Sequence, residues 1–314
     1  MIVFKYKKKR QFTTLAFSHD TKLLAAGGDF DDFIPIWELA TGAIVHNVPR
    51  IIGHTTQSIV FHSRARWLYV AHSYGLTAYS TETKELSELY GKNEFARNVA
   101  VDPTGKRLIG SHHPLWKGGP AVQRLTCFNI AKPDNPVTEW EIQDAHAPHN
   151  AWTELAAFFA NGKKYAAAER TDGHVYTTRI VIRNTTDGEV SRTCGGTGTD
   201  AQALAVSPLG TSIVSSVDRR LYVFDLANPT AALREIVNSG RRHFTGIAFH
   251  PSGRYLAATS NDETVKLYDT TTWEVARTFT WDIGRMRSVA FSPDGTLAAA
   301  GSDKGKVVVW DVDV

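Results

Sequence analysis

Cysteine and methionine are rare in this chain, because only two residues of each occur among its 314 residues. Cys127 and Cys194 are too few for a disulfide framework, and their spacing matches no metal-ligand motif. Two such residues are typical of small buried side chains in a reducing compartment. We therefore expect a cytoplasmic protein without a resident metal or other cofactor.

Long hydrophobic runs are missing as well. No apolar stretch approaches eighteen residues, so we expect no membrane-spanning helix. The first six residues turn polar too early for a secretory signal. A strong excess of one charge is also missing, because 35 Lys and Arg residues oppose 32 Asp and Glu residues. The net charge of +3 does not by itself argue for a nucleic-acid partner.

What the chain does have is a repeat. Seven times, a short apolar strand ends in an apolar anchor residue, and in most cases a turn containing Pro, Gly or both follows. The successive anchors are 44, 40, 57, 48, 43 and 42 residues apart: Phe17, Phe61, Val101, Phe158, Val206, Phe249 and Phe291. A repeat of this length predicts units that bury their faces only against one another, in a stack or a ring.

Each unit continues with further short strands. A second strand with small residues follows the turn, and a third strand then ends near an aromatic residue and, in most units, an acid. In the last unit, the third strand Val307–Val309 leads into Trp310 and Asp311. A more polar fourth strand connects to the next unit. Short strands at regular spacing, with little helical periodicity, predict an all-β fold.

The two ends of the chain complement each other. The last unit stops after its third strand, whereas an extra strand, Ile2–Tyr6, precedes the first anchor. Pairing of this strand with the last unit would complete seven four-stranded sheets. We therefore predict a single domain over residues 1–314, with residues 1–10 as the closing strand and its lead-in. The predicted fold is a seven-bladed β-propeller of four-stranded antiparallel blades, closed by the N-terminal strand.

The repeats resemble those of the WD-repeat β-propeller family over essentially the whole chain. The clearest matches in the last two units are His250–Gly253, Ser260–Asp262, Tyr268-Asp269, Ser292–Gly295, Gly301–Asp303 and Trp310-Asp311. The resemblance implies a tetrad in which a histidine, a serine, a turn aspartate and a third-strand tryptophan tie neighbouring strands together. It thereby implies structural roles for Asp218, Asp262, Asp303, Ser302 and Trp310.

The implied tetrad is incomplete in this chain. Asp282 and Gly240 fill the histidine positions of the last two units. In the fourth unit, Arg183-Asn184 replaces the Trp-Asp pair. We expect these departures to leave the fold intact, because packing between the sheets supplies most of the stability.

Three irregular stretches are concentrated in units three and four: Ser111–Pro120, Asp144–Trp152 and Glu169–Tyr176. In such a propeller, segments before first strands and turns between second and third strands share one face. Loops on a rigid scaffold commonly carry function, and exposed Trp is favoured at binding hot spots. We therefore predict an interaction face that includes Trp116, Lys117, His146, His149, Trp152, Arg170 and His174. Alternatively, the loops only cover the blade junction, with Trp116 and Trp152 as local core.

Five histidines in these stretches raise the question of a metal site: His112, His113, His146, His149 and His174. His146 and His149 are three residues apart, but in a Pro-containing loop, so helical geometry cannot bring them together. No established ligand spacing occurs. We interpret the five as histidines tolerated in surface loops.

Basic residues form a second group, in the segments that lead into units six, seven and one. They are Arg241, Arg242, Arg285, Arg287 and the run Lys7–Arg10. Because these units are neighbours in a closed ring, this basic arc could attract a phosphorylated or acidic segment or a nucleic-acid backbone. Acids in loops of the same face, among them Asp282 and Asp303, dilute its field. We therefore favour a solvated surface and expect no nucleic-acid partner.

Two positions, six and four residues before each anchor, are predicted to face the central channel. They include Phe95, Arg97, Arg285 and Arg287, and most of the others are polar. No catalytic motif recurs around them, and the chain has no Gly-rich phosphate loop. We predict a non-catalytic scaffold, monomeric by itself, that binds a protein or peptide. The alternatives are a small-molecule or metal-dependent hydrolase using the loops of units three and four, and an anion- or nucleic-acid-binding protein using the basic arc.

Overall fold

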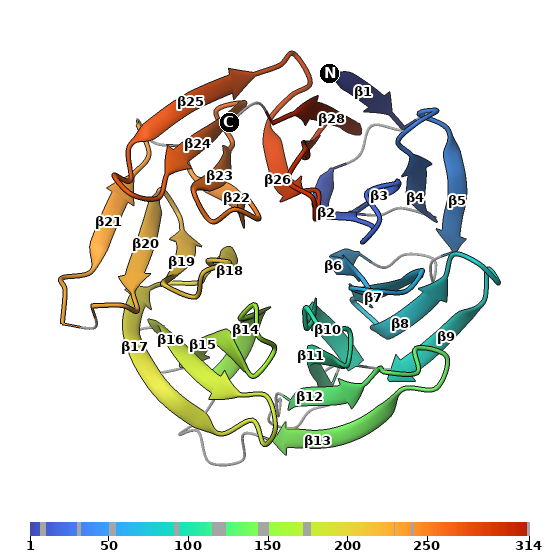
Figure 1. Ribbon diagram of the computed structural model, residues 1–314, viewed down its shortest axis with the longest axis horizontal. Helices are drawn as coiled ribbons and strands as arrows, with labels where there is room; N and C mark the ends of the chain where they lie inside the picture. The colour runs from blue at the N-terminus through green and yellow to red at the C-terminus, as the bar shows by residue number, and fades with distance from the viewer. Residues whose placement is uncertain are drawn as a thin grey trace.

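The computed structural model describes residues 1–6, 11–29, 33–49, 55–90, 94–114, 124–143, 151–171, 177–228, 230–239 and 242–312. These residues form 28 β-strands in seven antiparallel sheets of four strands each. The sheets stand around a central axis as the blades of a ring (Figure 1). This arrangement confirms the predicted all-β, seven-bladed propeller. The described residues include no helix that is long and apolar enough to cross a membrane.

Blades are numbered in chain order, and their strands run from the axis outward. Blades 1 and 2 consist of β2 (Phe12–Phe17), β3 (Leu23–Gly28), β4 (Phe33–Glu38), β5 (Ile44–Pro49) and β6 (Thr56–Phe61), β7 (Trp67–His72), β8 (Gly75–Ser80), β9 (Leu86–Tyr90). Blades 3 and 4 consist of β10 (Glu94–Val101), β11 (Arg107–Pro114), β12 (Arg124–Asn129), β13 (Val137–Gln143) and β14 (Ala151–Phe158), β15 (Lys164–Thr171), β16 (Thr177–Asn184), β17 (Val190–Gly198).

The other three blades have the same order. Blades 5 and 6 consist of β18 (Ala203–Val206), β19 (Ser212–Val217), β20 (Arg220–Asp225), β21 (Arg234–Val237) and β22 (Phe244–Phe249), β23 (Tyr255–Ser260), β24 (Thr264–Asp269), β25 (Val275–Thr280). Blade 7 consists of β26 (Met286–Phe291), β27 (Leu297–Ser302), β28 (Lys306–Asp311) and β1 (Ile2–Lys5).

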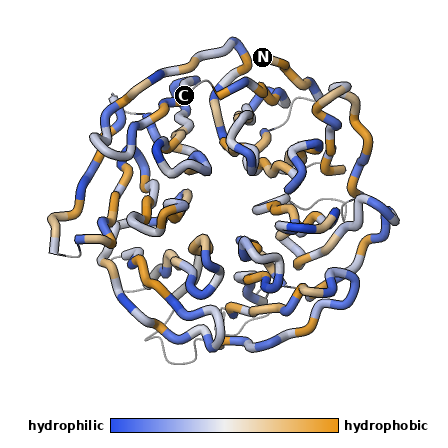
Figure 2. Tube along the Cα trace, viewed as in Figure 1, coloured by the Kyte–Doolittle hydropathy of each residue, from blue (hydrophilic) through white to orange (hydrophobic). Residues whose placement is uncertain are grey.

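The core lies between the blades. Among the described residues, buried hydrophobic side chains form seven clusters, each drawn from two neighbouring blades. Near the axis the sheets approach closely, so the second strands carry fully buried alanines such as those of Ala166–Ala168 and Ala298–Ala300. Farther out, buried aromatics such as Trp37 and Trp310 fill the wider gap. Hydrophobic stretches therefore recur along the strands of every blade (Figure 2).

Glycines in the turns after the first strands have positive φ values, which few other residues adopt. Gly295 has a φ of 76°, and a Cβ added there would lie 2.7 Å from Nε2 of His250 in the preceding blade. The same ring nitrogen lies 3.0 Å from the carbonyl oxygen of Gly295. Gly105 and His62 repeat this close approach between blades 3 and 2. The predicted turn glycines therefore also form contacts between blades.

The N-terminal strand closes the ring as predicted. β1 pairs with β28 in antiparallel register, from Ile2 opposite Val309 to Lys5 opposite Lys306. Phe4 of this strand is 4% exposed, and its ring stacks on Trp37 of blade 1 at a centroid distance of 5.5 Å. The first strand of the chain thus joins blade 7 by backbone hydrogen bonds and blade 1 by side-chain packing.

Blades 3 and 4 have longer strands than the sequence predicts. β11 continues to Pro114, β14 begins at Ala151, and β15 continues to Thr171. The expectation that these positions belong to loops is wrong, because cross-strand pairing continues to Glu94 opposite Pro114 and to Ala151 opposite Thr171. The remaining parts of the three stretches, residues 115–123, 144–150 and 172–176, lie outside the described residues.

Candidate functional site

β-Bulges in the first strands place side chains at the channel, and among the described side chains five of them line it: Thr13, Gln57, Arg97, Thr245 and Arg287. In six of the seven first strands, the register with the second strand shifts by one residue near the start. A bulge leaves one residue unpaired and changes the direction of its side chain. The six bulged residues are Thr13, Gln57, Arg97, Glu154, Thr245 and Arg287. Each stands four residues before its anchor, at a position predicted to face the channel.

A cavity of about 580 Å³ opens at this end of the channel, and we call it the channel mouth. All seven blades contribute to its lining, in chain order with Asp29, Gln57, Arg97, Leu155, Asp200, His243 and Arg287. Its volume is within the range of ligand sites in proteins. The prediction that Arg97 and Arg287 face the channel is confirmed. Phe95 and Arg285 are not among the described residues that line the cavity.

The channel mouth is polar and carries charges of both signs. Amides and hydroxyls, among them Gln11, Gln202 and Thr245, can donate and accept hydrogen bonds. Two arginines, Arg97 and Arg287, are balanced by two aspartates, Asp29 and Asp200. This lining suits the mixed donors, acceptors and charges of a peptide better than a uniformly anionic chain.

The basic arc is partly neutralised by nearby carboxylates. Nη2 of Arg287 lies 3.8 Å from Oδ2 of Asp303, which also accepts the backbone N–H of Arg285 through Oδ1 at 3.0 Å. Nδ1 of His243 lies 3.6 Å from Oδ1 of Asp218. Arg242 is exposed, whereas Arg241 and Lys7–Arg10 lie outside the described residues. These pairs reduce the field that a nucleic-acid backbone would meet.

An aromatic pair stands beside Arg97 at the start of blade 3. The rings of Phe95 and His113 stack at a centroid distance of 5.0 Å, and both residues are half-buried. Phe95 thus stands two residues before a channel-lining arginine on the same strand. Stacked aromatics of this kind give a binding surface apolar area at little cost in conformational entropy.

The other predicted interaction residues cannot be placed as side chains. Trp152 and Arg170 are backbone neighbours in β14 and β15, and their side chains lie outside the described part. Five more lie entirely outside it: Trp116, Lys117, His146, His149 and His174. Within the described residues, no group of three or more His, Cys, Asp or Glu side chains could hold a metal ion.

The predicted tetrad residues make local structural contacts. Oδ1 of Asp262 accepts both the backbone N–H and the hydroxyl of Thr264, and the Ser302 hydroxyl donates to the carbonyl of Lys306. Trp310 packs on Trp281 at a centroid distance of 4.7 Å.

In blade 6, the buried Asn238 amide donates to Oγ of Ser260 at 2.8 Å. Sequence reasoning missed Asn238, because the repeat pattern puts Gly240, which is outside the described residues, at the histidine position.

Blade 4 replaces the tetrad with a buried ion cluster. The register puts Glu169 at the position of Ser302 and Arg183 at the position of Trp310. Nε of Arg183 donates to Oε1 of Glu169 at 2.7 Å, and Nη2 of Arg179 donates to Oε2 at 2.9 Å. The Glu169 side chain is 2% exposed. This arrangement is a structural element, because the two guanidinium groups compensate the charge of the buried carboxylate.

Blade 3 carries a different buried network. His112 occupies the serine position and is 2% exposed, so the interpretation as a surface histidine is wrong. Its Nδ1 lies 2.7 Å from Oε2 of Glu94, and its Nε2 lies 2.8 Å from Oγ1 of Thr126. The His112 ring stacks on Tyr90 at 3.8 Å. Arg124, in turn, places Nη1 3.4 Å from Oε1 of Glu94.

The hydrogen-bonded chain from Glu94 through His112 to Thr126 resembles the acid, base and hydroxyl of a serine hydrolase triad. The Thr126 side chain is nevertheless 2% exposed, and its hydroxyl also lies 3.3 Å from Oε2 of Glu141. A substrate carbonyl cannot reach a hydroxyl that is enclosed in this way. The network therefore connects β10, β11, β12 and β13 and does not form an open catalytic site.

Burial of His112 gives a pH-dependent prediction. Burial lowers the pKa of His112 below its usual 6.5, although the hydrogen bond to Glu94 opposes this shift. Because the unfolded chain binds the proton more readily, the full contribution to stability is present above pH 6.5 and is lost as the pH falls below it. We expect denaturant unfolding to show lower stability at pH 5.5 than at pH 7.5, and H112Q to reduce this difference. An unchanged difference in H112Q would contradict this assignment.

Comparison with known proteins finds two WD repeats in the C-terminal part of the chain. Residues 235–269 and 274–311 match the family model "WD domain, G-beta repeat". Each matched segment begins in or just before the outer strand of one blade and ends with the third strand of the next. The repeat in sequence is therefore offset from the blade in space, which is the same arrangement that makes β1 the outer strand of blade 7.

Several curated proteins are similar over parts of the chain. WD repeat-containing protein VIP3 of Arabidopsis thaliana is 34% identical over 141 residues, which are 40% of this chain and 43% of that protein. Meiotic recombination protein rec14 of Schizosaccharomyces pombe is 25% identical over 190 residues, 58% of this chain and 61% of that protein. Target of rapamycin complex subunit wat1 of the same yeast is 22% identical over 165 residues, 39% of this chain and 52% of that protein.

The chain thus spans less than two thirds of the length of these relatives. The family match covers two repeats, and the same four-stranded blade recurs seven times in the ring. The chain is thus a seven-bladed β-propeller in which two repeats match the WD-repeat model, and it is similar in part to a WD repeat-containing protein.

Proposed function

We propose that the protein is a non-catalytic scaffold that binds a peptide segment of a partner protein at the channel mouth. The observation that carries this proposal is the 580 Å³ cavity to which all seven blades contribute. Closed packing between the blades holds these side chains in place, so a ligand need not order the site as it binds. One similar protein is named as a subunit of a complex, which agrees with a scaffold role.

Mixed charge favours a protein ligand over the alternative of an anionic chain. Arg97 and Arg287 can bind carboxylates or carbonyl groups of a peptide, while Asp29 and Asp200 can accept its N–H groups or a basic side chain. A nucleic-acid backbone would place its phosphates beside these two aspartates. The affinity of a nucleic acid for the basic arc would also fall steeply as the salt concentration rises. The affinity of a peptide that contacts both positive and negative side chains would depend less on salt.

Selection from a displayed library of random 12-residue peptides tests this function. We expect peptides selected on the wild type to lose at least tenfold in affinity for R97A and for R287A, because arginines in enclosed sites are frequent hot spots. R254A is the matched control, since Arg254 is an arginine in the turn after β22, on the opposite face. If selection yields no binders, or if R254A weakens binding as much as R287A, the channel mouth is not the peptide site.

A further inference from the structure

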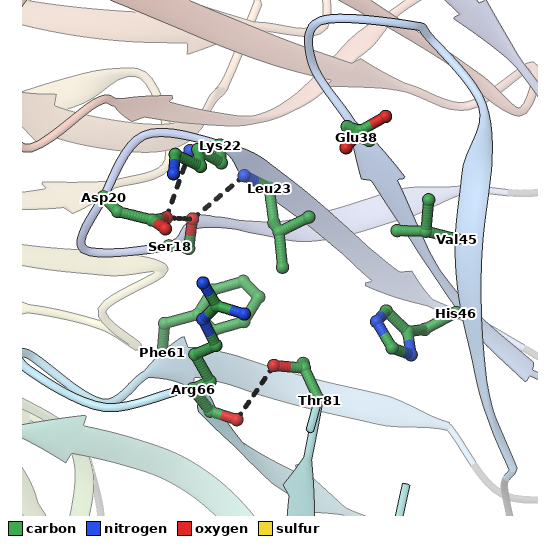
Figure 3. Close-up of a pocket in the computed structure, with 10 residues that line it drawn as sticks. All are labelled: Ser18, Asp20, Lys22, Leu23, Glu38, Val45, His46, Phe61, Arg66 and Thr81. Atoms are coloured by element: carbon green, nitrogen blue, oxygen red, sulfur yellow. Dashed lines mark hydrogen bonds between the residues drawn. The ribbon is translucent and has the colours of Figure 1, made fainter. Parts of the chain in front are cut away.

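A second cavity lies between blades 1 and 2, on the face opposite the channel mouth. It has a volume of about 350 Å³, near the lower limit for ligand sites. Blade 1 contributes the turn after β2, the end of β4 and the start of β5, and blade 2 contributes β6 and the turn before β7 (Figure 3). We call it the side pocket. Because it belongs to the other face of the ring, its occupant is independent of the proposed channel function.

Apolar side chains form one part of the side pocket. Leu23 and Phe61 contribute to it from the two blades, and Val45 contributes from the outer strand β5. Val45 is 40% exposed, so the pocket offers apolar surface that the fold itself leaves uncovered. Burying such surface beneath an apolar ligand group is favourable by about 25 cal/mol per Å².

The two acids of the side pocket already have hydrogen-bond donors. Oδ1 of Asp20 accepts the hydroxyl of Ser18 at 2.6 Å and the backbone N–H of Lys22 at 3.2 Å (Figure 3). Glu38 accepts the hydroxyl of Thr41 at 2.8 Å. Both carboxylates therefore have hydrogen-bond donors in the turns that carry them and stay anionic.

The two cationic side chains of the pocket, Arg66 and Lys22, have fewer close partners than the acids. Arg66 extends from blade 2 toward the turn of blade 1 (Figure 3), and among the described residues its Nε pairs with the distant, exposed Glu82 at 3.8 Å. The Lys22 ammonium has an electrostatic interaction with the Asp20 carboxylate of the same turn. The turn that carries Arg66 is fixed, because both the N–H and the hydroxyl of Thr81 donate to the Arg66 carbonyl oxygen. The pocket thus presents two cations beside apolar surface, together with the carboxylates of Asp20 and Glu38.

We propose that the side pocket binds a partner segment in which a leucine-like side chain stands next to an acidic residue. The apolar side chain would occupy the space beside Val45, Leu23 and Phe61. The neighbouring carboxylate would accept hydrogen bonds from the Arg66 guanidinium, which offers two parallel N–H donors. Lys22 would add a second positive charge at the same opening.

Methyl NMR titration with three blocked dipeptides tests this proposal. The probes are N-acetyl-Leu-Glu-amide and its two counterparts with Gln or Lys in place of Glu. We expect the methyl signals of Leu23 and Val45 to shift, with the Glu probe binding at least fivefold more tightly than the Lys probe. R66E should weaken the Glu probe at least fivefold and reverse this preference. R64E is the matched control, because Arg64 is in the same turn but does not line the pocket.

Each other outcome overturns the proposal. Equal affinities for the three probes, or equal effects of R66E and R64E, would remove the role of Arg66. Shifts at Leu155 instead of Leu23 and Val45 would place the probe in the channel mouth, because Leu155 lines that cavity. That result would reject the side pocket while leaving the channel proposal intact. No shift at any of the three residues would reject the side pocket as well, and unchanged Leu155 signals in R66E would show that the variant is folded.

Discussion

Replacing Glu169 with alanine is expected to lower the free energy of unfolding by about 3–5 kcal/mol. The carboxylate is 2% exposed and accepts hydrogen bonds from Arg183 and Arg179, whose side chains are 12% and 45% exposed. Its loss would leave the Arg183 guanidinium buried between blades 3 and 4 without its anion. Denaturant unfolding followed by intrinsic fluorescence measures the effect as a lower midpoint.

Two further variants separate charge from packing in this cluster. R179M should cost about 1 kcal/mol or less, because Arg179 is half exposed and Arg183 still pairs with Glu169. The double variant E169L/R183M replaces the buried pair with apolar side chains and should recover most of the stability lost in E169A. If E169A costs no more than R179M, the cluster does not stabilise the junction in this way.

Replacing Phe4 with alanine is expected to destabilise the protein by about 3–5 kcal/mol, which is typical for a buried Phe to Ala change. Phe4 is 4% exposed, stacks on Trp37 and also lies against Gly42 of blade 1. The substitution removes the side-chain contact between the first strand of the chain and blade 1. Denaturant unfolding should therefore show a lower midpoint, and native-state hydrogen exchange should become faster in β1 and β28.

Ile2 provides the control in the same strand. It pairs with Val309 through the backbone but is 48% exposed, so I2A should cost less than about 1 kcal/mol. Equal losses in F4A and I2A would show that closure depends on backbone pairing alone. A double-mutant cycle with W37A would then show no coupling between Phe4 and Trp37.

Most of the fold can be predicted from local sequence features that recur in the seven units. The anchor, the turn glycine and the small second strand can be recognised in units such as Phe249–Ala258 because each unit obeys the same packing rules. The channel positions could be predicted for the same reason, since Arg97 and Arg287 keep a constant distance from their anchors. The β-bulge that directs these side chains could not be predicted, because a bulge has no fixed sequence signature.

The departures from the repeat are where prediction from sequence failed. The sequence predicts loops at His112 and Glu169, because the usual turn spacing ends before them. Their strands in fact continue, and each buried polar side chain has a partner on another strand: Glu94 for His112 and Arg183 for Glu169. Such pairs lie 18 and 14 residues apart in the chain, so the spacing of a single unit does not reveal them.

The sequence by itself determined the number of blades and the channel positions of Arg97 and Arg287, four residues before their anchors, because both depend on spacing within one repeated unit. The extra N-terminal strand predicted that the ring closes through β1, and the pairing register of β1 with β28 shows how it does so. Only the tertiary structure decided which polar residues are buried between blades and where the side pocket opens, as for Glu169 and Arg66. These features arise where two different units meet. Their stability depends on contacts between side chains of both units, and the sequence pattern of one unit does not predict such contacts.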